Sequence, residues 1–216
     1  MRALTLTLLI VAGVSSQAWA KPTFVGHNAP KSSLRTTPLD KPSGNIKIKA
    51  DNLDESLDIN IYKSDGTLDD AVLAQLDKLW RCTATGQVRA VNSDLYVMLS
   101  RIYDHFGGKE IHIVSGFRAT DNDSSRHWHA SAMDIRVEAT SYRTVYEFAQ
   151  TLDVGGDHSM GIGQYPNSEF VHIDFRAPGD VSFRWTDYSG GSHKKSEPPA
   201  KKKSTGRTQP ARKPVS

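Results

Sequence analysis

The sequence has 216 residues, of which 38% are hydrophobic and 24% are charged. These proportions are those of an ordinary globular protein, so they exclude collagen-like, coiled-coil and wholly disordered chains. The single cysteine, Cys82, excludes an internal disulfide framework and a cysteine-rich zinc ribbon.

The net charge of +3 conceals a difference between the C-terminal tail and the rest of the chain. Residues 193–216 contain eight basic residues and one acid, a net charge of +7. The remainder, apart from Arg2, holds 18 basic and 23 acidic residues, a net charge of −5. We therefore predict an acidic folded domain followed by a disordered basic tail over residues 190–216. Such a tail is most often merely solvated; the alternative is adhesion to an anionic envelope polymer or a membrane surface.

The chain begins with the pattern of a secretory signal peptide. Arg2 precedes the apolar run Ala3–Val14, and Ala18-Trp19-Ala20 follows it. A basic start, a short apolar stretch and an Ala-x-Ala site predict a signal peptide over residues 1–20, cleaved after Ala20. The apolar run is too short for a membrane span, and the lack of cysteine pairs suits a periplasm-like compartment. We therefore expect an exported, periplasmic protein.

The elements that follow predict one domain behind a linker. Residues 21–45 are rich in Pro, Ser, Thr and Lys without periodicity and are predicted to be a polar linker. Within residues 46–189, alternating apolar residues and short apolar runs predict strands at Ile46–Lys49, Leu57–Ile61, Ile111–Ser115, Ala132–Val137, Phe170–Phe175 and Val181–Trp185. Helical spacing predicts helices over residues 68–80, with Thr67 as N-cap, and near Asp94–His105 and Tyr142–Leu152. The fold class is α+β, with helices packed on a small antiparallel or mixed sheet.

Polar residues interrupt the apolar pattern of these strands at three places, which are Ser115–Arg118, Ser125–Ile135 and Glu169–Asp174. Period-two alternation turns Asp134 away from the apolar neighbours on its strand, and it does the same for His172 and Asp174. A histidine-rich loop precedes Asp134. Two histidines and one carboxylate are the ligand set of a catalytic zinc, with a fourth position for water. The spacing alone leaves a structural or solvent-facing role open.

The same segments resemble a known family. Residues 125–134 resemble the Ser-x-His-x-x-Gly-x-Ala-x-Asp motif of the Hedgehog/D-Ala-D-Ala-peptidase zinc fold, through Ser125, His127, Ala132 and Asp134. Ser115-Gly116-Phe117-Arg118 and Glu169-Phe170-Val171-His172 stand where that family has its Ser-Gly-Tyr-Arg and Glu-x-x-His segments. The YcbK/MepK-type murein endopeptidases are the branch that the chain resembles in Gly161-Ile162-Gly163-Gln164-Tyr165-Pro166, Phe170–Asp174 and Arg184-Trp185. The resemblance spans residues 46–185.

This resemblance implies a role for each matching residue. His127, Asp134 and His172 are expected to bind Zn²⁺. Glu169 is expected to be the general base that takes a proton from water at the metal, and Arg118 to anchor substrate or stabilise the oxyanion. The second candidate for the base is Asp174, which could instead orient the imidazole of His172. Ser125 and His129 are candidates for residues that contact the metal ligands without binding the metal, although His129 could equally face solvent.

Two positions depart from the family pattern. Ala130 replaces a glycine, so the loop carries strain if that position requires a positive φ. Phe117 replaces a tyrosine and lacks its hydroxyl. The remaining histidines, at positions 27, 105, 112, 158 and 193, are predicted to have no metal role.

The chemistry and the export signal together predict a zinc-dependent peptidase that cleaves peptidoglycan stem-peptide cross-links through water activated by the metal. One alternative is a D-Ala carboxypeptidase on the same substrate. Another is a non-catalytic zinc-fold binding module of the cell envelope. Nucleic-acid binding lacks a folded basic face. We expect a monomer, and the sequence leaves open which bond is cut.

Overall fold

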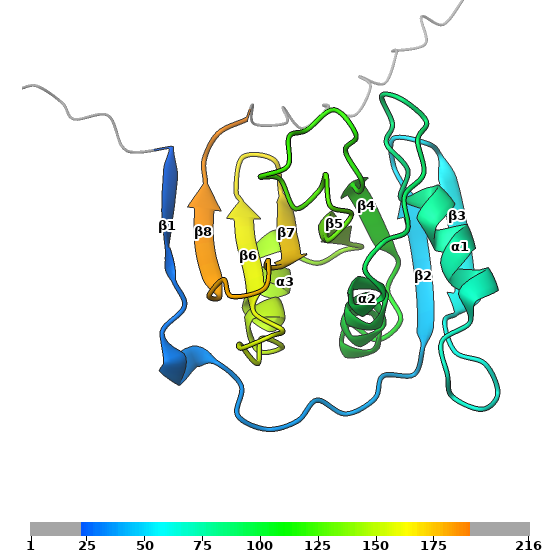
Figure 1. The fold of residues 1–216 in the computed structure, drawn as a ribbon, viewed down its shortest axis with the longest axis horizontal. Helices are drawn as coiled ribbons and strands as arrows, with labels where there is room; N and C mark the ends of the chain where they lie inside the picture. The colour runs from blue at the N-terminus through cyan, green and yellow to red at the C-terminus, as the bar shows by residue number, and fades with distance from the viewer. Residues whose placement is uncertain (1–22, 191–216) are drawn as a thin grey trace, which may run out of the picture.

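The computed structural model describes residues 23–190 (Figure 1). The predicted signal peptide and nearly all of the predicted basic tail, including His193, lie outside the described residues. Among the helices of the described part, none has the length and apolar composition needed to cross a membrane.

Within residues 23–190, eight strands form one mixed sheet, which spans the described domain from edge to edge in Figure 1. Their bounds are β1 Phe24–Asn28, β2 Asn45–Ala50, β3 Glu55–Asn60, β4 Ile111–Ser115, β5 Ala132–Val137, β6 Met160–Tyr165, β7 Phe170–Phe175 and β8 Phe183–Asp187. Their order across the sheet is β1-β8-β6-β7-β5-β4-β2-β3. The pairs β2–β4 and β6–β8 are parallel, and the other neighbours are antiparallel. The predicted α+β class with a mixed sheet is confirmed.

In the described part of the chain, three α-helices accompany the sheet: α1 Asp70–Leu79, α2 Ser93–His105 and α3 Tyr142–Gln150, with one short 3₁₀ helix at Lys31–Ser33. The Asp69 carboxylate caps α1 by accepting from the Ala71 N–H, so the prediction of Thr67 as N-cap is wrong. Thr67 instead lies in the preceding turn, where Asp65 accepts from its hydroxyl. Helix α2 packs on β2, α3 packs on the central strands β5, β6 and β7, and α1 packs on the edge strand β3.

Alternation along the strands divides the central sheet into two faces. Apolar residues on the face covered by α2 and α3 form the buried core: Ile48, Ile111, Met133, Ile135, Ile162, Val171 and Ile173. Since successive side chains point to opposite faces, Asp134, His172 and Asp174 share the other face. The polar cluster predicted from the sequence is therefore held by a rigid, fully paired part of the sheet.

Two strands were not predicted, and a third begins later than expected. Part of the predicted linker forms β1, which pairs with β8 at the sheet edge and is exposed along its whole length. Exposure explains why β1 shows no apolar alternation. The other strand, β6, contains Gly161 and Gly163, and glycine is depleted in strands. Strand β8 begins at Phe183 rather than Val181.

A buried ion pair joins β8 to the rest of the domain. Arg184 Nη2 lies 2.5 Å from Asp153 Oδ2, and both side chains are almost wholly buried. The Asp153 carboxylate also accepts from the Ser182 hydroxyl at 3.0 Å, and Arg184 Nη1 donates to the Met160 carbonyl at 3.1 Å. These bonds connect the segment after α3 with β6 and β8, and they hold β8 in place beside the polar face.

Candidate metal centre

His127, Asp134 and His172 converge at the polar face of the sheet. His172 Nδ1 lies 2.8 Å from Asp134 Oδ1 and 3.2 Å from His127 Nε2. His127 Nε2 lies 3.4 Å from Asp134 Oδ2. Within residues 23–190, this is the one group of three His, Cys, Asp or Glu side chains whose possible ligand atoms all lie within 4.8 Å of one another. The structure thus brings together the three residues that the sequence predicts as metal ligands.

Each candidate ligand is positioned by a different element. Asp134 on β5 and His172 on β7 are direct partners in the antiparallel register, so their side chains emerge side by side. His127 comes from the loop between β4 and β5, which turns back toward the sheet at Ala130. Ala130 has φ of 51°, so this alanine adopts the left-handed backbone conformation that glycine adopts most easily. The Ala130 carbonyl accepts from the Asn92 N–H at 3.0 Å and so ties this loop to α2.

Hydrogen bonds fix the orientation of both imidazole rings. His127 Nδ1 donates to the Gly116 carbonyl at 2.7 Å, and His172 Nε2 donates to Asp174 Oδ2 at 3.0 Å. The remaining nitrogens, Nε2 of His127 and Nδ1 of His172, therefore face Asp134, and in the neutral rings they carry the lone pairs that a cation would bind. Carbonyl and carboxylate partners on the far nitrogen are typical of histidines that bind metals.

The electrostatics of this buried cluster require a positive charge at its centre. Burial by itself raises the pKa of Asp134, but His127 and His172 outweigh it and hold that pKa well below its usual range. Burial lowers the pKa of His172, but hydrogen bonds to Asp134 and Asp174 outweigh it and raise the pKa to about 9. A buried carboxylate is stable only beside a cation, which a proton on the imidazole or a divalent metal ion can supply. Two nitrogens and one carboxylate fit a divalent transition metal.

Arg118 lies at the rim of the cluster. Its Nη2 is 3.9 Å from Asp134 Oδ2, its Nε is 3.3 Å from Asp121 Oδ2, and its side chain is half-exposed. Ser125 donates to Asp121 Oδ2 at 2.6 Å, so it contacts the site through Asp121 rather than through a ligand. Sequence reasoning missed Asp121, although its position three residues after Arg118 is an ion-pair spacing.

Asp174 lies behind His172 and is held from two sides. Arg176 Nη1 lies 3.3 Å from its carboxylate. Gly161 on β6 is its direct neighbour in the register, and a Cβ at Gly161 would lie 2.1 Å from Asp174 Oδ2. Only glycine leaves room for the carboxylate at this place, which gives a physical reason for the first glycine of the Gly-x-Gly segment.

Substituting alanine for Gly161 is expected to displace Asp174 and release the ring of His172. The expected result is a loss of about 10- to 100-fold in metal affinity, the usual effect of removing the partner of a metal-binding histidine. Competition of the variant with a chromogenic chelator measures that affinity. Ile162→Val, on the same strand but facing the core, is the matched control, and an unchanged affinity in Gly161→Ala would contradict the assigned role of Asp174.

Two further residues near the site were missed. Trp185 Nε1 donates to the Tyr165 hydroxyl at 3.1 Å, and the Trp185 ring centroid lies 5.1 Å from that of His172. A Cβ at Gly163 would lie 2.1 Å from the Trp185 ring. Tyr165 and Trp185 stand in the Gly-x-Gly-x-Tyr and Arg-Trp segments of the family pattern. The sequence alone assigns no role to these two residues.

The structure does not bring Glu169 or His129 into the cluster. Glu169 is exposed, has φ of 55°, and lines a separate cavity of about 610 Å³ with Asp51, His112 and Arg136. His129 is exposed, and its Nε2 donates to the Asp123 carbonyl at 2.7 Å. Of the two roles considered for His129, the solvent-facing one agrees with this position.

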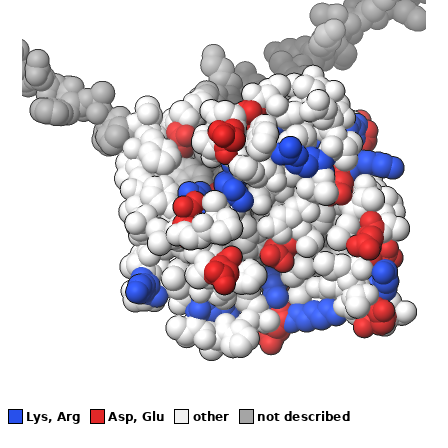
Figure 2. Space-filling model, in the orientation of Figure 1, with Lys and Arg blue, Asp and Glu red and all other residues white. Residues whose placement is uncertain are grey.

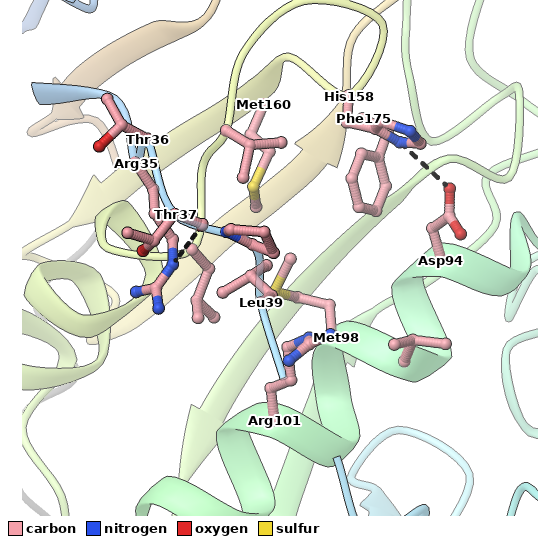
Figure 3. A pocket seen from close by; sticks show the side chains of 14 residues that line it. Arg35, Thr36, Thr37, Leu39, Asp94, Met98, Arg101, His158, Met160 and Phe175 are labelled. Atoms are coloured by element: carbon pink, nitrogen blue, oxygen red, sulfur yellow. Dashed lines mark hydrogen bonds and ion pairs between the residues drawn. The ribbon is translucent and has the colours of Figure 1, made fainter. Parts of the chain in front are cut away.

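Another cavity, of about 530 Å³, lies on the helix-covered side, between α2 and the segment 35–39 (Figure 3). Met98, Met160 and Phe175 contribute apolar side chains to it, and Arg35 and Arg101 contribute charge. His158 is at its edge, 3.8 Å from Asp94. None of the residues predicted for the metal site lines this cavity, so it is separate from the metal centre.

Comparison with known proteins identifies the family. The profile of the family described as peptidoglycan L,D-endopeptidase MepK matches residues 41–181, more than half of the chain. This chain belongs to the MepK family. The matched span contains all three candidate ligands and Arg118. The protein is therefore a peptidoglycan endopeptidase of a metal-dependent peptidase family, as the sequence motifs predict.

Individual relatives are distant in sequence. Peptidoglycan L,D-endopeptidase MepK of Escherichia coli (strain K12) is 26% identical over 133 residues, which are 56% of this chain and 70% of that protein. A protein of Shigella flexneri with the same name matches to the same extent. Probable peptidoglycan L,D-endopeptidase MepK of Haemophilus influenzae is 28% identical over 118 residues, 48% of this chain and 61% of that protein. No solved structure matches the chain significantly.

Proposed function

We propose that this member of the MepK family is a zinc-dependent enzyme of the periplasm that hydrolyses L,D cross-links between peptidoglycan stem peptides. The observation that carries the proposal is the convergence of His127, Asp134 and His172 within the family match. Two imidazoles and one carboxylate are a frequent ligand set of catalytic zinc in hydrolases. The L,D specificity is that in the names of the relatives. The order of the motifs supports the Hedgehog/D-Ala-D-Ala-peptidase-like fold.

Different residues of the site would have different roles in amide hydrolysis. Zinc, when bound, would supply a Lewis acid and lower the pKa of its water toward 7. His127, Asp134 and His172 would hold the ion, and Asp174 would keep the His172 ring in the orientation that presents Nδ1. Arg118 at the rim would bind the carbonyl oxygen of the substrate and stabilise negative charge as it develops there; its distance of 3.9 Å from Asp134 supports this role.

Glu169 is expected to contribute little to the chemical step. Its side chain lines the neighbouring cavity, and Arg136 holds its backbone by donating to the Glu169 carbonyl at 3.2 Å. For Glu169→Gln we expect kcat within about threefold of the parent protein, because a proton acceptor must lie within hydrogen-bond reach of its donor. Glu138→Gln, in the same cavity, is the control. A loss of about 100-fold or more with zinc still bound would restore Glu169 as the base.

The domain boundaries and the location are part of the proposal. A signal peptide over residues 1–20 would deliver residues 21–216 to the compartment that contains the substrate. Residues 46–189 would form the peptidase domain, and the basic tail would follow it.

The test is incubation of residues 21–216 with purified peptidoglycan, after chelation and after zinc is restored, with chromatography of the released muropeptides. Zinc-dependent conversion of L,D-cross-linked dimers to monomers is the expected result. Loss of terminal D-Ala alone would replace the proposal with a carboxypeptidase. Loss of D,D-cross-linked dimers alone would correct the specificity.

The same experiment tests the alternative that the protein is a binding module without catalytic activity. In that case zinc would bind stoichiometrically and the cross-linked muropeptides would remain intact. The position of Arg118 argues against it, because a purely structural metal site does not need a half-exposed guanidinium 3.9 Å from a ligand carboxylate.

A further inference from the structure

A row of aromatic rings extends from the metal centre to the β1 edge of the sheet. The ring centroid of His172 on β7 lies 5.1 Å from that of Trp185 on β8. Trp185 lies 6.0 Å from Phe183 on the same strand. A Cβ at Gly26 on β1 would lie 2.6 Å from the ring of Phe183 and 3.0 Å from that of Phe24. We name Phe24, Phe183 and Trp185 the aromatic strip.

The register places this strip on the same sheet face as the metal ligands. Trp185 pairs with Gly26 on one side and with Gly163 on the other, and Gly163 pairs with His172. Paired residues share a face, so Trp185 and His172 emerge together. The absence of side chains at Gly26 and Gly163 leaves the backbone flat where rings lie against it. The rings lie close to the sheet there but are tilted to one another, Trp185 by 34° to Phe183 and by 50° to His172.

The outer part of the strip is accessible. Phe24 is 51% exposed, whereas Trp185 next to His172 is buried; Val181 and Tyr188, which flank the two ends of β8, are 57% and 49% exposed. In Figure 2 the flank over β1 and β8, on the left, is mostly white, whereas Lys, Arg, Asp and Glu are interspersed over the rest of the visible face. Such a concentration of exposed apolar residues on one edge of a small domain marks a binding surface.

We propose that the aromatic strip binds the sugar rings of the peptidoglycan strand whose cross-link lies at the metal centre. This inference rests on the proposed function. Pyranose rings offer flat C–H faces that pack on aromatic rings, and their N-acetyl groups are neutral. The rings offer no partner to the carboxylates of a stem peptide, and Asp187, which pairs with Phe24 in the register, would repel them. Apolar rings beside a carboxylate that can accept from sugar hydroxyls therefore favour the glycan.

The dimensions agree with this assignment. From β7 across β6 and β8 to β1 are three strand spacings, about 14 Å in total. An extended peptide advances about 3.4 Å per residue, so about four residues span that distance. A stem peptide of a few residues joins the cross-linked position to the sugar, so the peptide and its glycan can occupy the centre and the strip simultaneously.

The experiment compares Phe24→Ala and Phe183→Ala with the parent protein on two substrates. One is intact peptidoglycan, and the other is the cross-linked peptide freed of sugars by an amidase. On intact peptidoglycan we expect KM to rise about tenfold for each variant with kcat maintained, the scale of losing one aromatic contact. On the sugar-free peptide the difference between variants and parent is expected to disappear. Phe24→Tyr, which keeps the ring, is expected to behave like the parent.

Val88→Ala is the matched control, because Val88 is 51% exposed but lies outside the strip. Equal losses on both substrates would overturn the inference and assign the strip to the peptide, and no loss on either would also overturn it. A change in oligomeric state of Phe24→Ala, measured by light scattering, would assign the strip to a second copy of this chain. If the parent cleaves neither substrate, the proposed function fails; cosedimentation of the parent and Phe24→Ala with peptidoglycan then tests the strip independently.

Discussion

Replacing Asp134 by asparagine is expected to abolish metal binding and to lower the rate of peptidoglycan cleavage by at least about a thousandfold. Asp134 is the one carboxylate among the three candidate ligands, and its oxygens lie 2.8 Å from His172 Nδ1 and 3.4 Å from His127 Nε2. Both histidines hold the pKa of this carboxyl well below its usual range, so it is ionised near neutral pH. An amide offers an oxygen without the charge that attracts the cation. Metal content by emission spectrometry and muropeptide chromatography measure the two effects.

Asp58→Asn is the control for this substitution, because it makes the same chemical change at an exposed position on β3 of the same sheet. It is expected to retain both metal and activity. Circular dichroism of the metal-free proteins separates loss of metal from loss of fold. An Asp134→Asn protein that kept stoichiometric zinc would remove Asp134 from the ligand set.

Replacing Arg184 by methionine is expected to destabilise the domain by about 3–5 kcal/mol, because it leaves the buried carboxylate of Asp153 without its cation. That carboxylate is fully buried, and the ion pair at 2.5 Å is reinforced by Ser182. For a domain of this size the corresponding fall in Tm is about 6–20 °C. Thermal unfolding followed by circular dichroism measures it. Activity is expected to fall with stability, since β8 carries Trp185 beside His172.

Arg81→Met provides a matched comparison at the surface. Arg81 forms an ion pair with Glu55 at 2.7 Å, but the side chain of Glu55 is 48% exposed. Solvent screens such a pair, so its loss is expected to cost less than about 1 kcal/mol. If Arg184→Met unfolded no earlier than Arg81→Met, the pair with Asp153 would not be what holds β8 in place.

Period-two alternation explains why much of the site is predictable from the sequence. It gives β4, β5 and β7 their bounds, and it places Asp134, His172 and Asp174 on one face of the sheet. The motif spacing supplies His127. These predictions depend only on local geometry, in which the direction of a side chain follows from its position in a strand.

The direction of Glu169 is not predictable in the same way. It precedes β7 in a turn with φ of 55°, and an alternating pattern says nothing about a residue in the left-handed region. The edge strand β1 was missed because its pairing with β8 joins residues more than 150 positions apart, and exposed edge strands carry no apolar signature. In both places the outcome depends on tertiary contacts, not on the local sequence.

The pairing of β1 with β8 also brings the two ends of the described domain together. The Tyr188 N–H donates to the Thr23 carbonyl at 2.6 Å, so the first and last strands leave the sheet at one corner. A short peptide could join them, and the chain could be reopened at the exposed turn around Asp65 without separating any strand pair. The same sheet can therefore form when the chain begins and ends at Asp65 instead of beside β1 and β8. A circular permutant opened at Asp65 is expected to retain the complete metal centre.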